Sequence, residues 1–276
     1  MRLMLMSLIG WVLLAAAVIY TVILLSLFFM QRRLIFPASP ERAELASIAS
    51  LTDRFQPVSI EGMGGAKLTS WFAPATRNDG RTIIYFHGNA GHVGGRVERV
   101  LPYLTVGYGA LLVGYPGYGG NAGKPSEQAF YAAARANLDF LAGQNVDASR
   151  LILFGESLGT AVAIQMAIER QAAAIILEAP LASIYLSAWA RYPYLAYNRL
   201  IRDKFASIDK IGNVRIPLLL IHGERDMTTA VKFGRSIFER ANEPKIGLFP
   251  TNAGHNDLMQ HGMPEAVLKF LAELPA

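Results

Sequence analysis

Residues 153–161 read LFGESLGTA, and they place Ser157 between two glycines, Gly155 and Gly159. An apolar run precedes the serine and an alanine-rich run follows it, as expected where a strand turns sharply into a helix. A G-x-S-x-G pattern at such a turn leaves the serine at the apex of a strained backbone. The amino end of the following helix adds positive potential where an oxyanion would form. The stretch therefore predicts a nucleophile rather than an ordinary turn residue.

The sequence on either side of this stretch alternates between strand-like and helix-like patterns. The runs PVSIEG (57–62) and KLTSWFAP (67–74) predict a hairpin, and RTIIYFHG (81–88) predicts a strand that is buried on both faces. The amphipathic run at 125–143 predicts a helix, as does HVGGRVERVLPYL at 92–104. The alternation predicts an α/β fold, with a mostly parallel sheet of about eight strands, an amino-terminal hairpin and helices on both faces.

A serine hydroxyl needs a base to become a nucleophile, and five histidines are available. His255 lies in TNAGHNDL (251–258), a loop after the last predicted strand, from which it can reach a serine at the carboxyl edge of the sheet. We therefore expect His255 to be the base. His87 and His222 end predicted strands and are expected to be structural. His92 begins a predicted helix and is expected to be solvated, and His261 is expected on the surface of the last helix.

The base in turn needs a carboxylate to orient it. Asp226 lies in the loop after the strand before last, and the order Ser157, Asp226, His255 is the one expected when the serine follows a strand-to-helix turn of this kind. Glu224 is the alternative acid, because it is two residues away in the same loop. Asp257 is expected to cap the helix that follows it. Two further acids are weighed, Glu178 as a remote alternative acid and Glu156 as a local hydrogen-bonding or surface group.

Two backbone N–H groups are expected to stabilise the oxyanion. One belongs to Leu158, directly after the serine, and the other comes from HGNAG (87–91), with Asn89 as the first choice and Ala90 as the second. No phosphate-binding glycine pattern follows any predicted strand. The chain contains no cysteine, so thiol catalysis and Cys-ligated zinc are excluded. We expect neither a cofactor nor a metal.

The amino-terminal segment has no charged side chain from Leu3 to Met30. As a helix it would be about 42 Å long, enough to cross about 30 Å of hydrocarbon. A cleaved signal peptide is the alternative, but its apolar region is only about 7–15 residues long. Arg32 and Arg33 follow the segment, which favours a body on the cytoplasmic side. We predict a single-pass membrane anchor at 1–31.

A connector is predicted at 32–56 and one α/β domain at 57–276. Within the domain, the aromatic-rich segment at 181–206 is either a short lid, which receives an acyl chain or rests on the bilayer, or a helix packed on the sheet. The net charge is +5, but no basic run is interleaved with aromatics, so nucleic-acid binding is not expected. The sequence leaves the oligomeric state open.

Several of these stretches resemble, in order and spacing, motifs of the α/β-hydrolase superfamily. They are HGNAG (87–91), GYPGYGGNAGKPSE (114–127), GESLGTAVA (155–163), HGERD (222–226) and AGHNDL (253–258). They are most similar to a membrane-anchored branch with yeast bud-emergence-type proteins and animal ABHD-type enzymes, some of which remove palmitoyl groups from proteins. The resemblance covers residues 32–274. It implies Ser157 as nucleophile, Asp226 as acid, His255 as base, and no cofactor.

The predicted function is that of a membrane-anchored serine hydrolase. It would cleave carboxylic ester or thioester bonds of acyl chains, with a lipid ester or an acylated protein of the bilayer as substrate. Two alternatives remain open: a hydrolase of a small soluble ester or peptide, and a catalytically silent interaction module tethered to the membrane.

Overall fold

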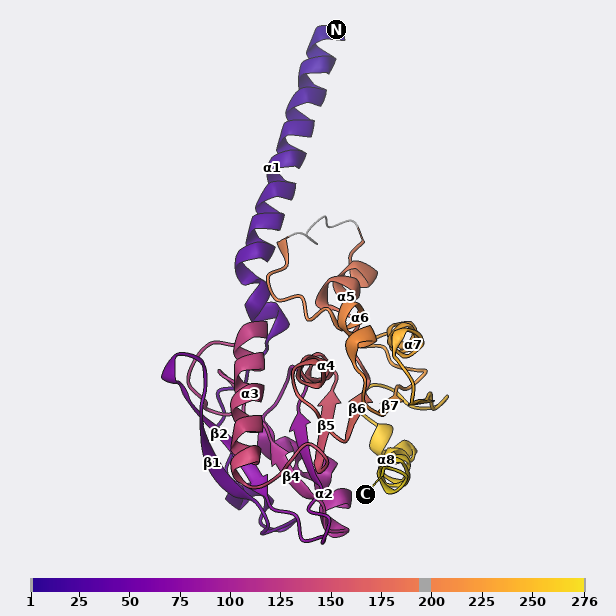
Figure 1. Cartoon of the computed structure of the whole chain (residues 1–276). Helices are drawn as coiled ribbons and strands as arrows, with labels where there is room; N and C mark the ends of the chain where they lie inside the picture. The colour runs from indigo at the N-terminus through magenta and orange to yellow at the C-terminus, as the bar shows by residue number, and fades with distance from the viewer. Residues whose placement is uncertain (1, 194–199, 276) are drawn as a thin grey trace.

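The computed structural model describes residues 2–193 and 200–275, and it shows a long helix that rises from a rounded α/β body (Figure 1). This helix, α1 (Arg2–Ile35), exposes apolar side chains along most of its length. Its part Met6–Ile35 is long and apolar enough to cross a membrane, by length and composition. The helix continues to Ile35, into the stretch predicted as a connector, and its last turn contacts the body.

Eight strands form a single sheet in the order β1-β2-β4-β3-β5-β6-β7-β8. Their bounds are β1 (Gln56–Glu61), β2 (Lys67–Ala73), β3 (Thr82–Phe86), β4 (Gly109–Leu112), β5 (Leu151–Glu156), β6 (Ala174–Glu178), β7 (Leu218–Ile221) and β8 (Lys245–Leu248). β1 pairs antiparallel with β2, and β2 antiparallel with β4, while the remaining pairs are parallel. The predicted mostly parallel sheet with an amino-terminal hairpin is confirmed.

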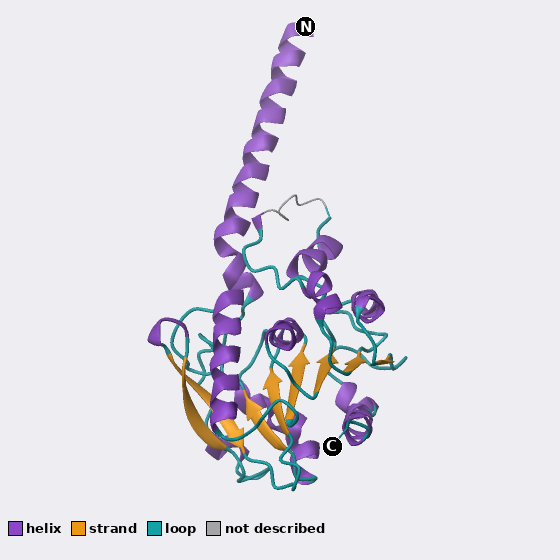
Figure 2. Ribbon diagram, viewed as in Figure 1, coloured by secondary structure: helices purple, strands orange, loops and turns teal. Residues whose placement is uncertain are grey.

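Helices cover both faces of the sheet (Figure 2). Their bounds are α2 (Val97–Thr105), α3 (Glu127–Gly143), α4 (Gly159–Glu169), α5 (Ile184–Arg191), α6 (Ser207–Lys210), α7 (Val231–Arg240) and α8 (Met263–Ala272). Successive residues of β5 serve the two faces: Leu153 packs in the core with α3, α4 and α7, and Ile152 packs in the core with α2 and α8.

The described residues also form short 3₁₀ turns: η1 (Leu45–Ile48), η2 (Met63–Gly65), η3 (Val93–Arg96), η5 (Ile211–Asn213) and η6 (Leu258–His261). The single helix predicted at 92–104 is wrong in detail, since η3 precedes α2. Two successive glycines, Gly94 and Gly95, disfavour a regular helix at that point.

The parallel strands end at a common edge of the sheet, where Glu156 of β5 is paired with Glu178 of β6. The arrowheads in Figure 1 point toward the side of the body from which α1 leaves. The loops that follow β3, β5, β7 and β8 therefore meet on the same side as the long apolar helix. Ligands of such sheets bind at this carboxyl edge.

Candidate active site

Ser157 occupies the turn between β5 and α4 and has a positive φ of 51°. A non-glycine residue in this left-handed region is strained, and such strain is concentrated at functional sites. The Ser157 N–H donates a hydrogen bond to the carbonyl oxygen of Glu178 on β6 (2.8 Å), which fixes the turn to the neighbouring strand. The predicted sharp strand-to-helix turn is thus present at this serine.

The two glycines of the turn are required by close approach of backbones. A Cβ at Gly159 would lie only 1.9 Å from the carbonyl oxygen of Phe86 on β3. A Cβ at Gly155 would lie 2.5 Å from the Cα of Thr160 in α4. Since real Cβ atoms do not approach so closely, any larger residue would separate α4 from the sheet. This packing gives a physical reason for both glycines of the G-x-S-x-G pattern.

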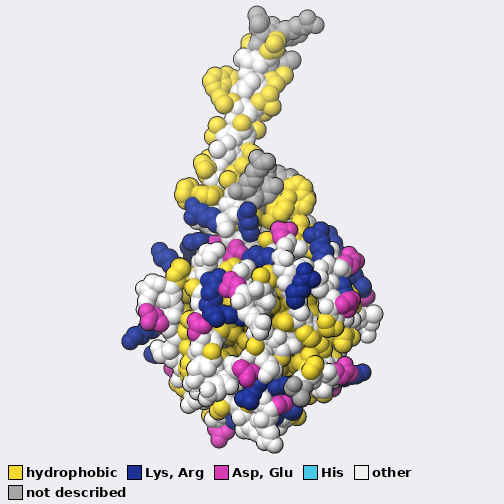
Figure 3. All heavy atoms as spheres, viewed as in Figure 1, with side chains coloured by type: hydrophobic (Ala, Val, Ile, Leu, Met, Phe, Trp, Pro, Cys, Tyr) yellow, Lys and Arg dark blue, Asp and Glu magenta, His cyan; other side chains and the backbone are white. Residues whose placement is uncertain are grey.

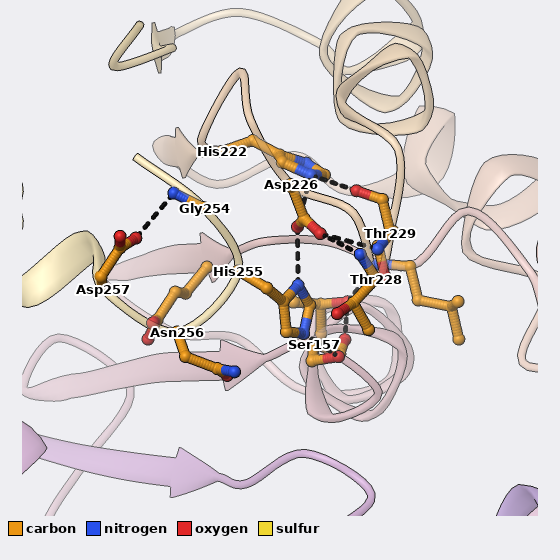
Figure 4. A network of polar contacts seen from close by, with 12 residues as sticks. Ser157, His222, Asp226, Thr228, Thr229, Gly254, His255, Asn256 and Asp257 are labelled. Atoms are coloured by element: carbon orange, nitrogen blue, oxygen red, sulfur yellow. Dashed lines mark hydrogen bonds and ion pairs between the residues drawn. The ribbon is translucent and has the colours of Figure 1, made fainter. Parts of the chain in front are cut away.

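The structure brings together the three residues expected to form a triad. His255 Nε2 lies 3.1 Å from Ser157 Oγ, and His255 Nδ1 lies 2.6 Å from Asp226 Oδ2 (Figure 4). The serine follows β5, the aspartate follows β7 and the histidine follows β8, so three separate loops supply the three groups. Both contacts are within the reach that proton transfer requires.

The carboxylate of Asp226 is enclosed by hydrogen-bond donors. Its Oδ1 accepts from the N–H groups of Thr228 (2.8 Å) and Thr229 (2.7 Å). Burial by itself would raise the pKa of Asp226, but the hydrogen bonds from His222 and His255 outweigh it, and the pKa lies below its ordinary value. Asp226 is therefore a carboxylate at neutral pH, as the orientation of a neutral imidazole requires.

Glu224, the alternative acid, lies apart from this chain of contacts. Its side chain is exposed and accepts a hydrogen bond from Arg235 on α7 at 2.5 Å. Among the residues that the structure describes, no hydrogen bond joins Glu224 to His255.

His222 is a second histidine on the same carboxylate. Its Nε2 lies 3.0 Å from Asp226 Oδ2 and 2.8 Å from the carbonyl oxygen of Thr229, and Figure 4 shows it on the side of Asp226 away from His255. The sequence predicted only a structural role for His222, at the end of a strand. The spacing of four residues between His222 and Asp226 indicated that the two side chains could meet. Spacing within a loop does not determine which side chains are in contact, so the pair could not be predicted from it.

The oxyanion loop, residues 87–91, packs directly against the serine, because a Cβ at Gly88 would lie 3.4 Å from Ser157 Cβ. Asn89 is fixed by its side chain, which donates to the carbonyl oxygen of Ile35 (3.2 Å), and by its own carbonyl oxygen, which accepts from Tyr118 (2.9 Å). Within residues 2–193 and 200–275, no hydrogen bond engages the backbone N–H groups of Asn89, Ala90 or Leu158. These three are the N–H groups that the sequence predicted as oxyanion donors.

Two expectations for the loop around His255 are wrong. Asp257 does not cap the following helix, because its Oδ1 accepts from the N–H of Gly254 (2.6 Å) and so closes the histidine loop. His261 lies in the short turn η6 rather than in the last helix, and its Nε2 is 3.7 Å from Asp257 Oδ2.

A buried ionic cluster lies beneath the histidine loop. Glu156, expected as a local or surface group, is buried and accepts a hydrogen bond from Arg96 Nε at 2.6 Å. The fully buried Glu178 pairs with Arg99, which also donates to the carbonyl oxygen of Asn256 (3.1 Å). Burial raises the pKa of Glu178 to about 7, although Arg99 opposes the rise. Arg99 thus joins the sheet edge to the residue that follows His255.

Two hollows flank the site. A groove of about 460 Å³ lies between α5 and the loop after Asp226, and its lining includes Met227, Thr228 and Phe233. A cavity of about 400 Å³ lies beyond the oxyanion loop, beside Trp71 and His92. The groove adjoins the loop that carries Asp226, since Thr228 lines it and also donates to the Asp226 carboxylate. Among the described residues, no cluster of three His, Cys, Asp or Glu side chains could hold a metal ion.

The segment predicted as a lid contains α5, whose Trp189 is 45% exposed. Tyr194 and Tyr197, which contribute to its aromatic content, lie outside the described residues.

Comparison with known proteins places the chain among hydrolases. Residues 78–205 match the family described as serine aminopeptidase, S33. An uncharacterized protein of Mycobacterium tuberculosis is 35% identical over 93% of this chain and 92% of its own length. The alpha/beta hydrolase domain-containing protein 17C of Xenopus tropicalis is 32% identical over 76% of this chain and 68% of its own length. An esterase of Pyrococcus furiosus superposes with a TM-score of 0.68 over 86% of this chain and 99% of its own, at 20% identity, a likeness of fold.

Proposed function

We propose that this chain is anchored in a membrane and cleaves acyl chains from lipid esters or acylated proteins. The chain belongs to the α/β-hydrolase superfamily and is a hydrolase of the serine esterase type. The similarity to ABHD-type hydrolases inferred from the sequence motifs is confirmed. The membrane anchor, the residue roles and the acyl substrate are the proposed part.

In the proposed mechanism, Ser157 Oγ attacks the acyl carbonyl carbon while His255 Nε2 accepts the hydroxyl proton. Asp226 holds the proton on His255 Nδ1 and stabilises the imidazolium that forms. The N–H groups of Leu158 and Asn89 stabilise the oxyanion of the tetrahedral intermediate. His255 then delivers its proton to the leaving oxygen or sulfur, and an acyl-serine remains. A water molecule, activated by His255, releases the acyl group as a carboxylic acid.

The observation that carries this proposal is the continuous chain of contacts from Asp226 through His255 to Ser157. It combines an ionised, enclosed carboxylate with a serine on a strained turn. In the part of the chain that the structure describes, no hydrogen bond engages the N–H groups of Leu158 and Asn89. A fold retained only for binding would not need these features together, so the arrangement argues against the catalytically silent module.

The acyl and membrane parts rest on two other features. The apolar helix α1 could hold the body at a bilayer, and the positions of Arg32 and Arg33 at its end favour the cytoplasmic side. The groove beside the acid loop offers Met227 and Phe233 to an apolar chain. An ester-hydrolysing enzyme located there would find its substrates among membrane lipids and lipid-modified proteins.

The proposal is tested with detergent-solubilised full-length protein and a fluorophosphonate probe, beside Ser157→Ala and His255→Ala. We expect labelling of the parent alone, and turnover of nitrophenyl esters with an optimum at medium or long acyl chains. Labelling of Ser157→Ala equal to the parent would show that another serine is the nucleophile. A folded parent with neither labelling nor turnover would support the tethered interaction module instead.

A peptide is the second candidate substrate, because the matching family is described as a serine aminopeptidase. An aminoacyl nitroanilide, assayed beside the ester series, separates the two. Faster turnover of the anilide than of every ester would replace the acyl-chain substrate with a peptide.

A further inference from the structure

The last turn of α1 is built into the body instead of leading to a free tether. Gln31 is buried, and its amide nitrogen donates to the carbonyl oxygen of Leu200 (3.1 Å) while its amide oxygen accepts from the N–H of Arg202 (2.8 Å). The helix and the stretch at 200–202 are therefore joined by a pair of hydrogen bonds in opposite directions.

The next residues strengthen this junction. Arg32 pairs with the buried carboxylate of Asp203 through two contacts, of 2.8 and 3.3 Å. The same carboxylate accepts from the N–H of Glu127, the first residue of α3 (2.9 Å). Phe36 is buried against Phe130 of α3, with ring centroids 5.3 Å apart. These contacts fix the direction in which α1 leaves the body.

The junction also sets the position of residues 200–204 along the axis of α1. The Arg202 guanidinium carbon lies 4.3 Å from the ring centroid of Phe28, a residue within the apolar part of α1. The N–H of Ile184, at the start of α5, donates to the carbonyl oxygen of Lys204 (2.9 Å). If α1 crosses a bilayer, the stretch from Leu200 to Lys204 must lie at the level where its apolar surface ends.

The surface at this level has the composition of a membrane interface. We define the membrane-proximal face by the exposed residues Arg32, Arg33, Trp189, Arg191, Leu200, Arg202 and Lys204. Its five basic side chains are accompanied by one acid in the described stretches 31–36, 184–193 and 200–205, the buried Asp203. Figure 3 shows Lys and Arg side chains gathered where α1 enters the body, beside hydrophobic side chains.

We propose that the membrane-proximal face lies in the headgroup layer of the bilayer that α1 crosses and binds anionic phospholipid headgroups there. The inference rests on the proposed membrane anchor. Each basic residue near an anionic membrane surface strengthens the binding of the protein to that surface about fivefold. Trp189 (45% exposed) and Leu200 (36% exposed) provide the aromatic and apolar contacts that suit the interface.

This placement has a consequence for substrate access. Ala190 and Arg191 of α5 line the groove beside the acid loop, so the groove shares an element with the membrane-proximal face. An acyl chain could pass from the bilayer to the groove beside α5 without crossing bulk water. The position of the face thereby deepens the proposed preference for lipid-borne substrates.

The absence of cysteine from the chain makes a direct test possible. Single variants Leu200→Cys, Leu14→Cys and Gly143→Cys of the full-length protein are labelled with a fluorophore and placed in vesicles of phosphatidylcholine, with or without phosphatidylglycerol. Lipids that carry a headgroup nitroxide act as quenchers. Gly143 is the control because α3 starts beside Asp203 and its 17 residues place its other end about 25 Å away.

We expect the label at Leu200 to be quenched more strongly with phosphatidylglycerol present, and the label at Gly143 to be unaffected. The double substitution Arg33→Gln/Lys204→Gln should weaken the contact about 25-fold and release part of the quenching. Equal quenching at Leu200 in both vesicles would overturn the binding of anionic headgroups. No quenching there, with Leu14 inaccessible to an aqueous quencher, would overturn the whole placement while α1 still spans. A Leu14 label open to the aqueous quencher would instead overturn the membrane anchor.

Discussion

Replacement of Arg99 by methionine should both destabilise the fold and slow the reaction. The substitution leaves Glu178 fully buried without its partner, and removal of one member of a buried ion pair costs about 3–5 kcal/mol. Because the pKa of Glu178 is already raised to about 7, it will rise further without the guanidinium, and the carboxyl will be neutral at pH 7. Neutralisation limits the penalty, so we expect the lower end, about 3 kcal/mol.

The effect on the reaction follows from the second contact of the same side chain. Arg99 donates to the carbonyl oxygen of Asn256, the residue after His255 (3.1 Å). A hydrogen bond from a charged donor contributes about 1.5–3 kcal/mol. If that energy positions His255 against Ser157, its loss should lower kcat/KM by roughly 10- to 150-fold. Arg99 touches no reacting atom in this scheme and acts as a positioning residue.

The assay combines urea unfolding in detergent with ester turnover and with the rate of fluorophosphonate labelling. The variants are Arg99→Met, Arg99→Lys, Glu178→Gln and the double variant Arg99→Met/Glu178→Gln. The lysine variant keeps the charge and should recover most of the stability but less of the activity, because a single ammonium cannot reach two acceptors in the guanidinium geometry. The double variant should be less destabilised than the sum of the single ones, by about 1 kcal/mol or more.

Two results would refute this reasoning. Strict additivity of the two single substitutions would show that the ion pair makes no specific contribution to stability. A folded Arg99→Met protein with unchanged kcat/KM would show that the contact with Asn256 does not position the histidine.

Three further predictions concern Gly159, His222 and the titration of Glu178. Gly159→Ala should lower the free energy of unfolding by about 3 kcal/mol or more, because the new Cβ would lie 1.9 Å from a β3 carbonyl oxygen. Gly143→Ala, whose Cβ would lie in open space, should raise it by about 0.5–1 kcal/mol. Equal effects of the two substitutions in thermal unfolding would refute the close approach at Gly159. His222→Gln should lower kcat/KM about tenfold with KM nearly unchanged, because Asp226 loses a charged hydrogen bond, and an unchanged kcat would make His222 purely structural. The raised pKa of Glu178, about 7 against about 4.3 in the unfolded chain, means that the folded state binds more protons between these values. The contribution of Glu178 to the free energy of unfolding is therefore fully present below about pH 4 and is lost, by about 3 kcal/mol, as pH rises through 7. Urea unfolding at pH 5 and pH 8 should show this loss in the unsubstituted protein and not in Glu178→Gln.

Local patterns in the sequence were sufficient to predict the fold and the loops in which Ser157, Asp226 and His255 lie. A strand-to-helix turn with two glycines is a short-range feature, and the chain order of Ser157, Asp226 and His255 follows from the order of the strands whose loops carry them. The structure brings these three together because parallel strands end at one edge.

Features that depend on contacts between distant segments could not be predicted in the same way. The pairs Arg96–Glu156 and Arg99–Glu178 join residues 60 and 79 positions apart, and no local periodicity relates them. Glu156 was expected as a local hydrogen-bonding or surface group, and it is buried because distant residues, Tyr85 and Arg96, donate to its carboxylate. The expected cap at Asp257 failed for a different, local reason: the Asp257 carboxylate accepts from the N–H of Gly254, three residues earlier, instead of from the helix that follows.

The junction at the end of α1 bears on whether the apolar segment is an anchor or a cleaved signal. A signal peptide is dispensable once removed, and its end has no reason to make specific contacts in the mature body. Here the buried Gln31 is hydrogen-bonded to Leu200, Arg32 pairs with the buried Asp203, and the carbonyl oxygen of Ile35 accepts from Asn89 at 87–91 (3.2 Å). The small residues Ala15–Ala17 resemble a signal-peptide cleavage site. Cleavage there would keep these contacts but leave an apolar stub of more than a dozen residues in water, a heavy cost in free energy. Retention of the whole helix satisfies both constraints, and under the proposed anchor the end of α1 also supports the loop at 87–91.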